Sequence, residues 1–256
     1  MGDSSKLALV TGGLRRLGGH IAARLAQNGY NLALHGHSTS APEESLLNAI
    51  NASSAQWHGF SADFSQVGEP QRLFDAVTEH YGKVPDLLVN NASIFEYDNL
   101  SSFTQSSAEE HMRVNMIAPA VLTTLMAQNS NNAEPRSVVN IVDQRVRNPN
   151  GDQLSYTFSK QALAESVRSL AVACAPNLRV NGVAPGLTIP TTEYGTKQME
   201  NLADAMPLKR LSSPQDIADA VVYLASAQSV TGQIIFVDGG AQLKSFERDF
   251  VFMDAE

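Results

Sequence analysis

Short apolar runs and segments of helical periodicity alternate along the whole chain. We predict seven strands, at Leu7–Val10, Asn31–His35, Gln56–Ser61, Leu87–Val89, Ser137–Val142, Arg179–Val183 and Gln233–Val237. The spacing of apolar side chains predicts helices at 21–27, 43–52, 70–81, 108–128, 156–175 and 215–225. This alternation predicts an α/β fold with a doubly wound, mostly parallel sheet and helices on both faces, in a single domain spanning 1–256.

Two segments near the C-terminus depart from this rhythm. Residues 187–213 show no periodicity, which predicts a substrate-binding loop or lid, with a disordered insertion as the alternative. The tail from Gln242 to Glu256 carries five apolar side chains, at Phe246, Phe250, Val251, Phe252 and Met253. Because so many apolar groups avoid water, we expect the tail to dock on its own or a neighbouring subunit, near the active site.

Composition narrows the classes of function. The net charge of -8 and the pI near 5.2 argue against nucleic acid or an anionic membrane as the main partner. Cys174 is the single cysteine, which excludes an internal disulfide, and the histidines show no metal-ligand spacing, so no metal is expected. No apolar run suits a signal peptide or a membrane span, so we expect a soluble, cytoplasmic protein with Cys174 in its core.

The candidate chemistry centres on Tyr156, Lys160 and Asp143. Tyr156 and Lys160 are four positions apart and share one face of a helix, and Asp143 lies thirteen residues before Tyr156. An ammonium beside a phenol stabilises the phenolate and lowers its pKa, which gives a proton donor and acceptor usable near neutral pH. The same spacing also occurs on the surface of ordinary amphipathic helices, so the rest of the chain must decide.

A glycine turn follows the first predicted strand and precedes a helix. It reads Thr11-Gly12-Gly13-Leu14-Arg15-Arg16-Leu17-Gly18. Strand, glycine turn and helix together are typical of the opening of a dinucleotide-binding unit. Gly12 and Gly18 permit tight turning and close approach to a pyrophosphate at the helix N-terminus, and the arginines add positive charge there.

This turn resembles the Thr-Gly-x-x-x-Gly-x-Gly turn of short-chain dehydrogenases/reductases, with Arg16 in place of the middle glycine. Further matches follow in the family's order over nearly the whole chain, at Asn90-Asn91-Ala92-Ser93, Asn115, Tyr156 with Lys160, Pro185-Gly186 and Asp238-Gly239-Gly240. The resemblance implies a Rossmann-type oxidoreductase. It also implies that Tyr156 and Lys160 are the catalytic pair and that Asn115 holds a water of the proton relay through its backbone.

The resemblance further implies a cofactor site. Asp63 and Phe64 match the position that contacts adenine, and Leu187 and Thr188 open the loop beside the cofactor. The full set of implied cofactor-binding residues is Gly12, Leu14, Arg15, Arg16, Leu17, His37, Ser38, Asp63, Phe64, Asn91, Ala92, Ser93, Tyr156, Lys160, Pro185, Gly186, Leu187 and Thr188.

The residues after the second predicted strand indicate which dinucleotide binds. NAD-selective members usually carry an acidic residue there, to bind the ribose hydroxyls, whereas His35-Gly36-His37-Ser38-Thr39 has no carboxylate. Arg15, His37 and Ser38 could bind a 2′-phosphate, so NADPH is the expected cofactor. His37 could equally be a solvent-exposed turn residue.

Four residues indicate one branch of the family. Asp143 stands where the family normally has serine, and together with Arg16, Ser93 and Phe95 it resembles pteridine reductases and the bacterial dihydromonapterin reductases. In that branch the aromatic side chain stacks on the pterin, the arginine and serine contact the ring or cofactor phosphates, and the aspartate joins proton delivery with Tyr156. A flat heterocycle clamped between an aromatic ring and a nicotinamide agrees with this hypothesis.

Alternatives stay open at this point. Taken singly, Phe95 could be packing and Asp143 a loop cap. A carbonyl-reducing enzyme, acting on a 3-oxoacyl thioester or a sugar, would use Tyr156 and Lys160 equally well, although a carboxylate would repel the charge that develops on a carbonyl oxygen. A further alternative is a non-catalytic sensor that binds a dinucleotide and regulates a partner. The intact Tyr156, Lys160 and Asn115 argue against it, because a sensor has no need of them. The family also implies a homo-oligomer, with a tetramer favoured, that buries the helices at 108–128 and 156–175.

Overall fold

All seven predicted strands are present and form one parallel sheet. The computed structural model describes residues 5–130, 136–189 and 194–253. The strand order is β3-β2-β1-β4-β5-β6-β7, and every neighbouring pair is parallel. The strands are β1 (Lys6–Val10), β2 (Tyr30–Gly36), β3 (Trp57–Ser61), β4 (Leu87–Asn90), β5 (Arg136–Ile141), β6 (Leu178–Pro185) and β7 (Ile234–Val237). The predicted doubly wound parallel sheet is confirmed.

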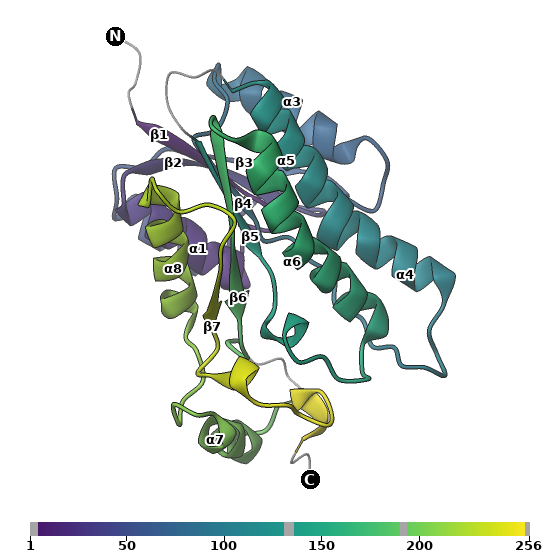
Figure 1. The fold of residues 1–256 in the computed structure, drawn as a ribbon. Coiled ribbons are helices and arrows are strands. Elements are labelled where there is room, and N and C mark those ends of the chain that lie inside the picture. Colours follow the sequence, from purple (N-terminus) through teal and green to yellow (C-terminus); the bar gives the residue numbers. More distant parts are fainter. Residues whose placement is uncertain (1–4, 131–135, 190–193, 254–256) are drawn as a thin grey trace.

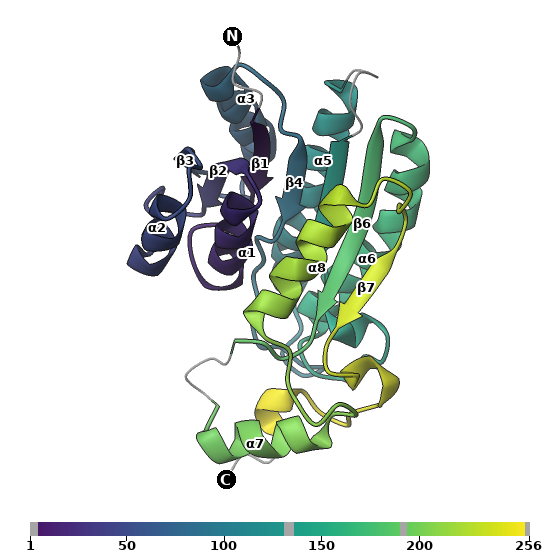
Figure 2. The same ribbon diagram turned by 90° about the vertical axis from the view of Figure 1, so that its left-hand side faces the viewer.

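Helices cover both faces of this sheet (Figures 1 and 2). One face carries α1 (Arg16–Gln27), α2 (Glu44–Asn51) and α8 (Pro214–Ser226). The other carries α3 (Glu69–Tyr81), α4 (Gln105–Met112), α5 (Ala118–Gln128) and α6 (Leu154–Cys174), with a π-helix η1 (Arg113–Ile117) between α4 and α5. Three 3-10 turns are also described, namely η2 (Gln144–Val146), η3 (Ala241–Leu243) and η4 (Phe250–Phe252).

Strand β1 shows how the sequence builds two cores. Successive side chains of a strand point to opposite faces of the sheet. Leu7 and Leu9 therefore pack in one buried cluster with residues of α3, α5 and α6, whereas Ala8 and Val10 pack in the other with residues of α1, α2 and α8. Because both faces are covered, parallel strands of this kind are apolar throughout rather than alternating.

The structure corrects two predictions made from periodicity. The helix expected at 108–128 begins at Gln105 and is interrupted by the π-helical turn η1. The stretch 187–213, expected to be without periodic structure, contains α7 (Thr196–Ala205), which lies below the carboxyl ends of β6 and β7 beside the tail (Figure 2). Part of that stretch, 190–193, lies outside the described residues.

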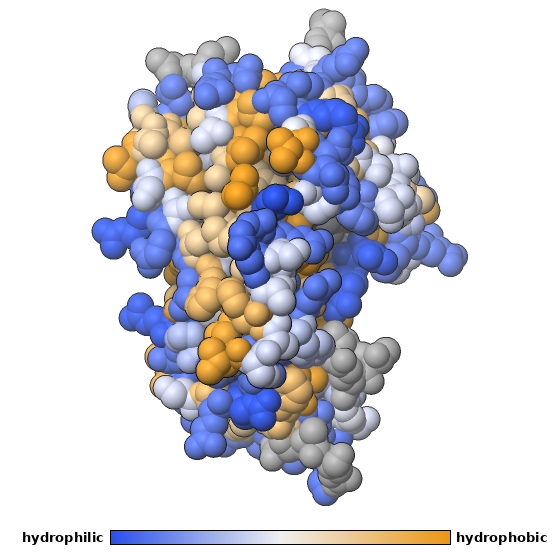
Figure 3. Space-filling view, turned by 90° about the vertical axis from the view of Figure 1, so that its right-hand side faces the viewer, coloured by the Kyte–Doolittle hydropathy of each residue, from blue (hydrophilic) through white to orange (hydrophobic). Residues whose placement is uncertain are grey.

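The outer face of α4, η1 and α6 exposes several large apolar side chains among polar ones (Figure 3). Ile117, Phe158 and Val172 are all exposed there, and Phe158 contacts the ring of Phe103 at 6.1 Å between centroids. Cys174 is buried, as predicted. Within the described ranges, none of the helices has the length and apolar character needed to cross a membrane.

Candidate active site

The predicted motifs gather at one edge of the sheet. Because the strands are parallel, their carboxyl ends all lie on the same side. The glycine turn follows β1, Asn91 follows β4, Asp143 comes soon after β5, and Gly186 follows β6. The strand order reverses direction between β1 and β4, and such a switch point leaves a crevice at the carboxyl ends where ligands bind in open α/β sheets.

The turns after β1 and β4 are joined by hydrogen bonds. The Thr11 hydroxyl accepts the backbone N–H groups of Asn91 at 2.9 Å and Ala92 at 3.0 Å. The Asn91 side chain donates back to the carbonyls of Thr11 at 3.0 Å and Gly12 at 3.1 Å. These hydrogen bonds fix the glycine turn after β1 relative to the segment after β4. The asparagine motif therefore supports the shape of the glycine turn.

Close packing and backbone conformation explain why the turn contains glycine. The backbone is strained at Arg16, the position where the motif departs from the family. Gly12 has a φ of 60°, in the left-handed region that glycine adopts freely. At Gly18 a Cβ would collide with the Gly12 carbonyl and lie 2.6 Å from the Asn91 amide. Arg16, which replaces the family's middle glycine, also has a positive φ, of 50°. A non-glycine residue there costs on the order of 1–3 kcal/mol, so the arginine is retained against backbone preference.

His35 supports the glycine turn from below, a role that the sequence analysis missed. The Gly12 N–H donates to its Nδ1 at 3.2 Å, and its Nε2 lies 2.9 Å from the Ala62 carbonyl. Burial lowers the pKa of His35 to about 4, so the ring is neutral and can accept at one nitrogen while donating at the other. Its ring stacks on Phe64 at 4.3 Å. The sequence signal for this role was the position of His35 at the end of a predicted apolar strand.

The N-terminus of α1 and the residues after β2 suit a phosphorylated dinucleotide. No side chain caps α1, no acidic residue occupies its first turn, and Arg15 and Arg16 are exposed there. Free amides and positive charge at a helix N-terminus favour an anion. His37 and Ser38 are also exposed, and His37 Nδ1 lies 3.4 Å from Asp63. The predicted cofactor residues therefore fit a nucleotide that carries several phosphates.

Other predicted cofactor positions differ in what they offer. The Phe64 side chain is buried against His35, which leaves its backbone as the group available to a ligand. Leu14 is buried beneath the turn, whereas Leu17 and Leu187 are half-buried. Thr188 donates to the Gly186 carbonyl at 2.9 Å and pairs with Ser212 at 2.9 Å, which ties the start of the substrate loop to its end.

A hydrogen bond joins the predicted acid–base residues. The Tyr156 hydroxyl donates to Asp143 Oδ2 at 2.8 Å. The other oxygen of Asp143 accepts the Arg145 N–H at 2.8 Å, and the guanidinium Nε lies 3.7 Å from it. Asp143 also caps the turn η2, so its interpretation as a loop cap is correct but incomplete. The carboxylate is held between a phenol and a buried arginine.

The pKa of Tyr156 is raised, whereas the sequence analysis expected the neighbouring ammonium to lower it. Burial, followed by the charge of Asp143, raises the pKa of Tyr156 well above its ordinary value. Lys160 donates to the Ile141 carbonyl at 2.8 Å, and its Nζ stands 5.7 Å from the centre of the phenol ring. Burial lowers the pKa of Lys160 to about 8 against the opposing charge of Asp143. Among the chain's own groups, then, burial and the Asp143 carboxylate together outweigh the opposing charge of Arg145 and keep the phenol protonated.

Asn115 sits in the π-helical turn, and its side chain is fully engaged. Its Oδ1 accepts the Ile94 N–H at 2.9 Å and the Ser93 hydroxyl at 3.1 Å. Its Nδ2 donates to the Ile94 carbonyl and to Ser159, both at 3.0 Å. The side chain therefore fastens the loop after β4 to α6, beside Tyr156. Only the backbone of Asn115 is left for the relay that the family resemblance implies, and π-helical turns often accompany functional sites.

Phe95 lies next to the Tyr156 phenol. The rings of Phe95 and Tyr156 meet edge to face, with centroids 4.6 Å apart, and Phe95 remains 42 % exposed. It is therefore not a core residue. The Arg145 guanidinium lies 5.7 Å from the Phe95 ring and 5.2 Å from the Tyr156 ring. The structure thus brings Phe95, Asp143 and Tyr156 together.

Two further acidic or basic residues at the site were missed from sequence. Arg145, two positions after Asp143, is buried and contacts Asp143, Gln153 and Thr157. Asp98 is buried and accepts the Ser155 N–H, at 3.2 Å to Oδ2, which holds the first turn of α6 in place. Charged residues in loops follow no helical or strand period. The only sequence hint at Arg145 was its closeness to Asp143 and Tyr156 in the chain. Within the described residues there is no cluster of three or more His, Cys, Asp or Glu side chains that could hold a metal ion.

Comparison with known proteins identifies the family. A profile described as Enoyl-(Acyl carrier protein) reductase matches residues 13–242. The chain belongs to the short-chain dehydrogenase/reductase family. Pteridine reductase 1 of Leishmania tarentolae is 34% identical, covering 94% of this chain and 97% of that protein. Carbonyl reductase family member 4 of Danio rerio is 32% identical, covering 93% and 99%.

A solved structure agrees with this family assignment. FolM Alternative dihydrofolate reductase 1 from Brucella canis, complexed with NADP, is similar with a TM-score of 0.85 and 34% identity, covering 95% of this chain and 96% of that one. This short-chain dehydrogenase/reductase is therefore an oxidoreductase, and the family resemblance drawn from its sequence is confirmed.

The packing at Gly18 leads to a first prediction. We expect Gly18→Ala to weaken NADPH binding roughly tenfold or more, because the added methyl group displaces the Gly12 carbonyl and the Asn91 amide. Fluorescence titration with NADPH measures the change. Gly19→Ala is the matched control in the same helix, since its Cβ would have no neighbour closer than 3.7 Å. Equal affinities in the two variants would contradict the role given to this turn.

Proposed function

We propose that this short-chain dehydrogenase/reductase reduces a dihydropterin with NADPH. The proposal rests on one observation, the hydrogen bond of 2.8 Å from Tyr156 to Asp143 with the exposed Phe95 ring beside it. Phe95 offers an aromatic surface for a flat heterocycle, and the phenol and carboxylate hold a proton next to that surface. A serine, which the family usually has at position 143, would offer only a hydroxyl.

NADPH fits the residues at the edge of the sheet. We assign its pyrophosphate to the uncapped first turn of α1 and its 2′-phosphate to Arg15, His37 and Ser38. The absence of a carboxylate among residues 37–39 supports the phosphorylated dinucleotide, since an acidic residue there would repel the phosphate. When bound, NADPH supplies the hydride. The NADP in the structure of the Brucella canis relative supports the same assignment.

The chain's own residues handle the proton. Reduction of a carbon–nitrogen double bond requires a proton at the nitrogen, and the raised pKa keeps the Tyr156 phenol protonated at neutral pH. Its hydroxyl hydrogen is shared with Asp143, so the pair can deliver a proton together. Lys160, with a pKa of about 8, carries an exchangeable proton one helical turn away. Asn115 keeps the loop after β4 against α6, so this geometry is preserved.

The carboxylate favours a heterocycle over a carbonyl substrate. A ketone develops negative charge on oxygen as it is reduced, and Asp143 would oppose that charge, whereas a ring nitrogen gains basicity and attracts a proton. Pteridine reductase 1 supports the pterin, while carbonyl reductase family member 4, at 32% identity, supports the rival carbonyl substrate. Asp143 is the residue on which we choose between them.

We further propose that the protein self-associates through the outer face of α4, η1 and α6, with a tetramer as the favoured state. Ile117 and Phe158 are 46% and 49% exposed on this face, which is a large exposure for apolar side chains of that size. Large apolar side chains gathered on one face of a protein mark interfaces.

The substrate assignment is tested by comparing two substrates. We expect NADPH oxidation with a dihydropterin to exceed that with an acetoacetyl thioester by roughly 100-fold or more in kcat/KM, a difference of about 2.7 kcal/mol in transition-state binding. Absorbance of NADPH follows both reactions. Faster turnover of the thioester would assign the enzyme to the carbonyl reductases instead.

Asp143→Ser, which restores the usual family residue, tests the role of the carboxylate. We expect dihydropterin reduction to fall by roughly 10²–10⁴-fold, because the proton partner of Tyr156 is lost. The affinity for NADPH, measured by fluorescence, should stay within about twofold, since no predicted phosphate contact changes. Asp143→Asn is the matched control for shape, as its amide oxygen can still accept the Arg145 N–H. An unimpaired rate in both variants would show that Asp143 takes no part in proton delivery.

Phe158→Glu tests the proposed interface. A buried, unpaired carboxylate destabilises an apolar contact, so we expect sedimentation velocity to show a smaller species than for the unmodified protein. Leu208→Glu is the control, since Leu208 is also an exposed apolar residue but lies outside that helical face. The interface is elsewhere if only the Leu208 variant dissociates.

A further inference from the structure

The tail after β7 folds back onto its own subunit and reaches the catalytic loop. Asp249 forms a hydrogen-bonded ion pair with Arg145, and both side chains are buried. Arg248 donates to Asp152 at 2.8 Å, and the Asp249 N–H donates to the same carboxylate at 2.9 Å. The prediction that the tail docks on its own subunit near the active site is confirmed for residues up to 253, and 254–256 lie outside the described part of the chain.

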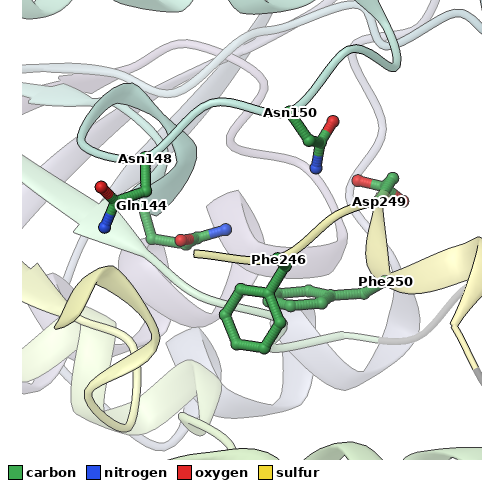
Figure 4. Close-up of a pocket in the computed structure, with 6 residues that line it drawn as sticks. All are labelled: Gln144, Asn148, Asn150, Phe246, Asp249 and Phe250. Carbon is green, nitrogen blue, oxygen red and sulfur yellow. The ribbon is translucent and has the colours of Figure 1, made fainter. Parts of the chain in front are cut away.

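The tail is also tied to the substrate loop. Gln198 of α7 donates to the carbonyls of Phe250 at 3.2 Å, Val251 at 3.2 Å and Met253 at 2.7 Å. Figure 4 shows Phe246, Asp249 and Phe250 of the tail lining one small pocket with Gln144, Asn148 and Asn150 of the loop after β5. The tail therefore lies between α7 and the loop that carries Asp143.

Arg145 contacts Asp249 of the tail on one side and Asp143 on the other. Its Nη2 donates to Asp249, while its Nη1 donates to Gln153 at 3.0 Å and Thr157 at 3.3 Å. On its other side it contacts Asp143 through its backbone N–H and its guanidinium. Without Asp249, the guanidinium would retain Asp143 as its only close carboxylate among the described residues, and would compete with Tyr156 for it.

We propose that Asp249 is a positioning residue for the reductase reaction, which fixes Arg145 so that Asp143 stays bonded to Tyr156. The proposal rests on the proposed roles of Tyr156 and Asp143. Asp249 itself touches neither of them. It acts through Arg145, and the tail that carries it is part of the catalytic architecture.

The charged groups around Arg145 and Tyr156 predict a pH effect as well. They are Asp143 from the loop after β5, Lys160 from α6, Asp152 before α6, and Arg248 and Asp249 from the tail. Asp249 is among the groups that raise the pKa of Tyr156, whereas Arg145 lowers it. Neutralising Asp249 therefore lowers the pKa of the phenol, and the decline of rate in alkaline solution should begin at a lower pH than in the unmodified protein.

Asp249→Asn tests the proposal in the full-length enzyme. Its amide oxygen can still cap the Val251 N–H, so the tail keeps its local shape. We expect kcat for the dihydropterin to fall roughly tenfold, with KM for NADPH within about twofold and the alkaline decline shifted downward. Asp249→Glu, which retains the charge, should recover most of the rate. An unchanged kcat and pH profile in Asp249→Asn would overturn the proposal.

Arg248→Gln is the matched control, because it removes the neighbouring tail ion pair with Asp152 and leaves Asp249 in place. It should loosen the tail to limited proteolysis without shifting the pH profile. If it reproduces the kinetics of Asp249→Asn, tail attachment alone explains the effect and the proposal fails.

A double-mutant cycle tests whether Asp249 acts through Arg145. In an Arg145→Gln background, Asp249→Asn should change kcat by no more than about twofold. A further tenfold loss would show that Asp249 acts by another route. Should Asp249→Asn not fold, the comparison of the double variant with Arg145→Gln decides instead, since neither charge is buried unpaired in the double variant. The two kcat values should lie within about twofold of each other, and a further tenfold loss in the double variant overturns the proposal.

The outcome is separable from that of the proposed function. If the unmodified enzyme reduces an acetoacetyl thioester and no dihydropterin, the substrate assignment fails. The same variants, assayed on the thioester, then still decide whether Asp249 positions Arg145.

Discussion

The hydrogen bond between the Tyr156 phenol and the Asp143 carboxylate is the interaction on which the site depends. It forms because β5 ends and α6 begins at the same edge of a parallel sheet. The bond stabilises the neutral phenol, and burial and Asp143 together outweigh the opposing charge of Arg145 on the Tyr156 pKa. A phenol in this state stays protonated at neutral pH, so its proton is in place when a reduction requires one. The usual family serine would leave that balance to the lysine.

A second constraint is the balance of buried charge around Arg145. Burying an ion without a partner costs several kcal/mol, and Arg145 lies between Asp143 and Asp249. One carboxylate comes from the loop after β5 and the other from the tail, 104 positions after Arg145. The tail in turn packs with α7 in a small apolar cluster containing Leu202, Met206 and Phe250. Helix α7, the tail and the loop after β5 therefore form one connected unit.

Local patterns predicted most of the fold, and the failures have physical reasons. Apolar runs identified all seven strands because both faces of the sheet are covered. Helix α7 was missed because its N-cap residue is Gly195, which has no side chain to cap the helix, and a π-helical turn such as η1 has no sequence signal. At the site, family motifs placed Asp143, Tyr156 and Phe95 together. They could not reveal Asp249, whose pairing with Arg145 depends on the path of the whole chain.

The strained backbone at Arg16 has a consequence for redesign. Stabilising a protein by restoring the commonest family residue would select glycine at this position and serine at Asp143, since those are the two sites where the chain departs most clearly from its motifs. Glycine would relieve the left-handed conformation. It would also remove a guanidinium from the mouth of the cofactor crevice. A consensus-derived variant would thus gain stability while losing two side chains of the proposed substrate site.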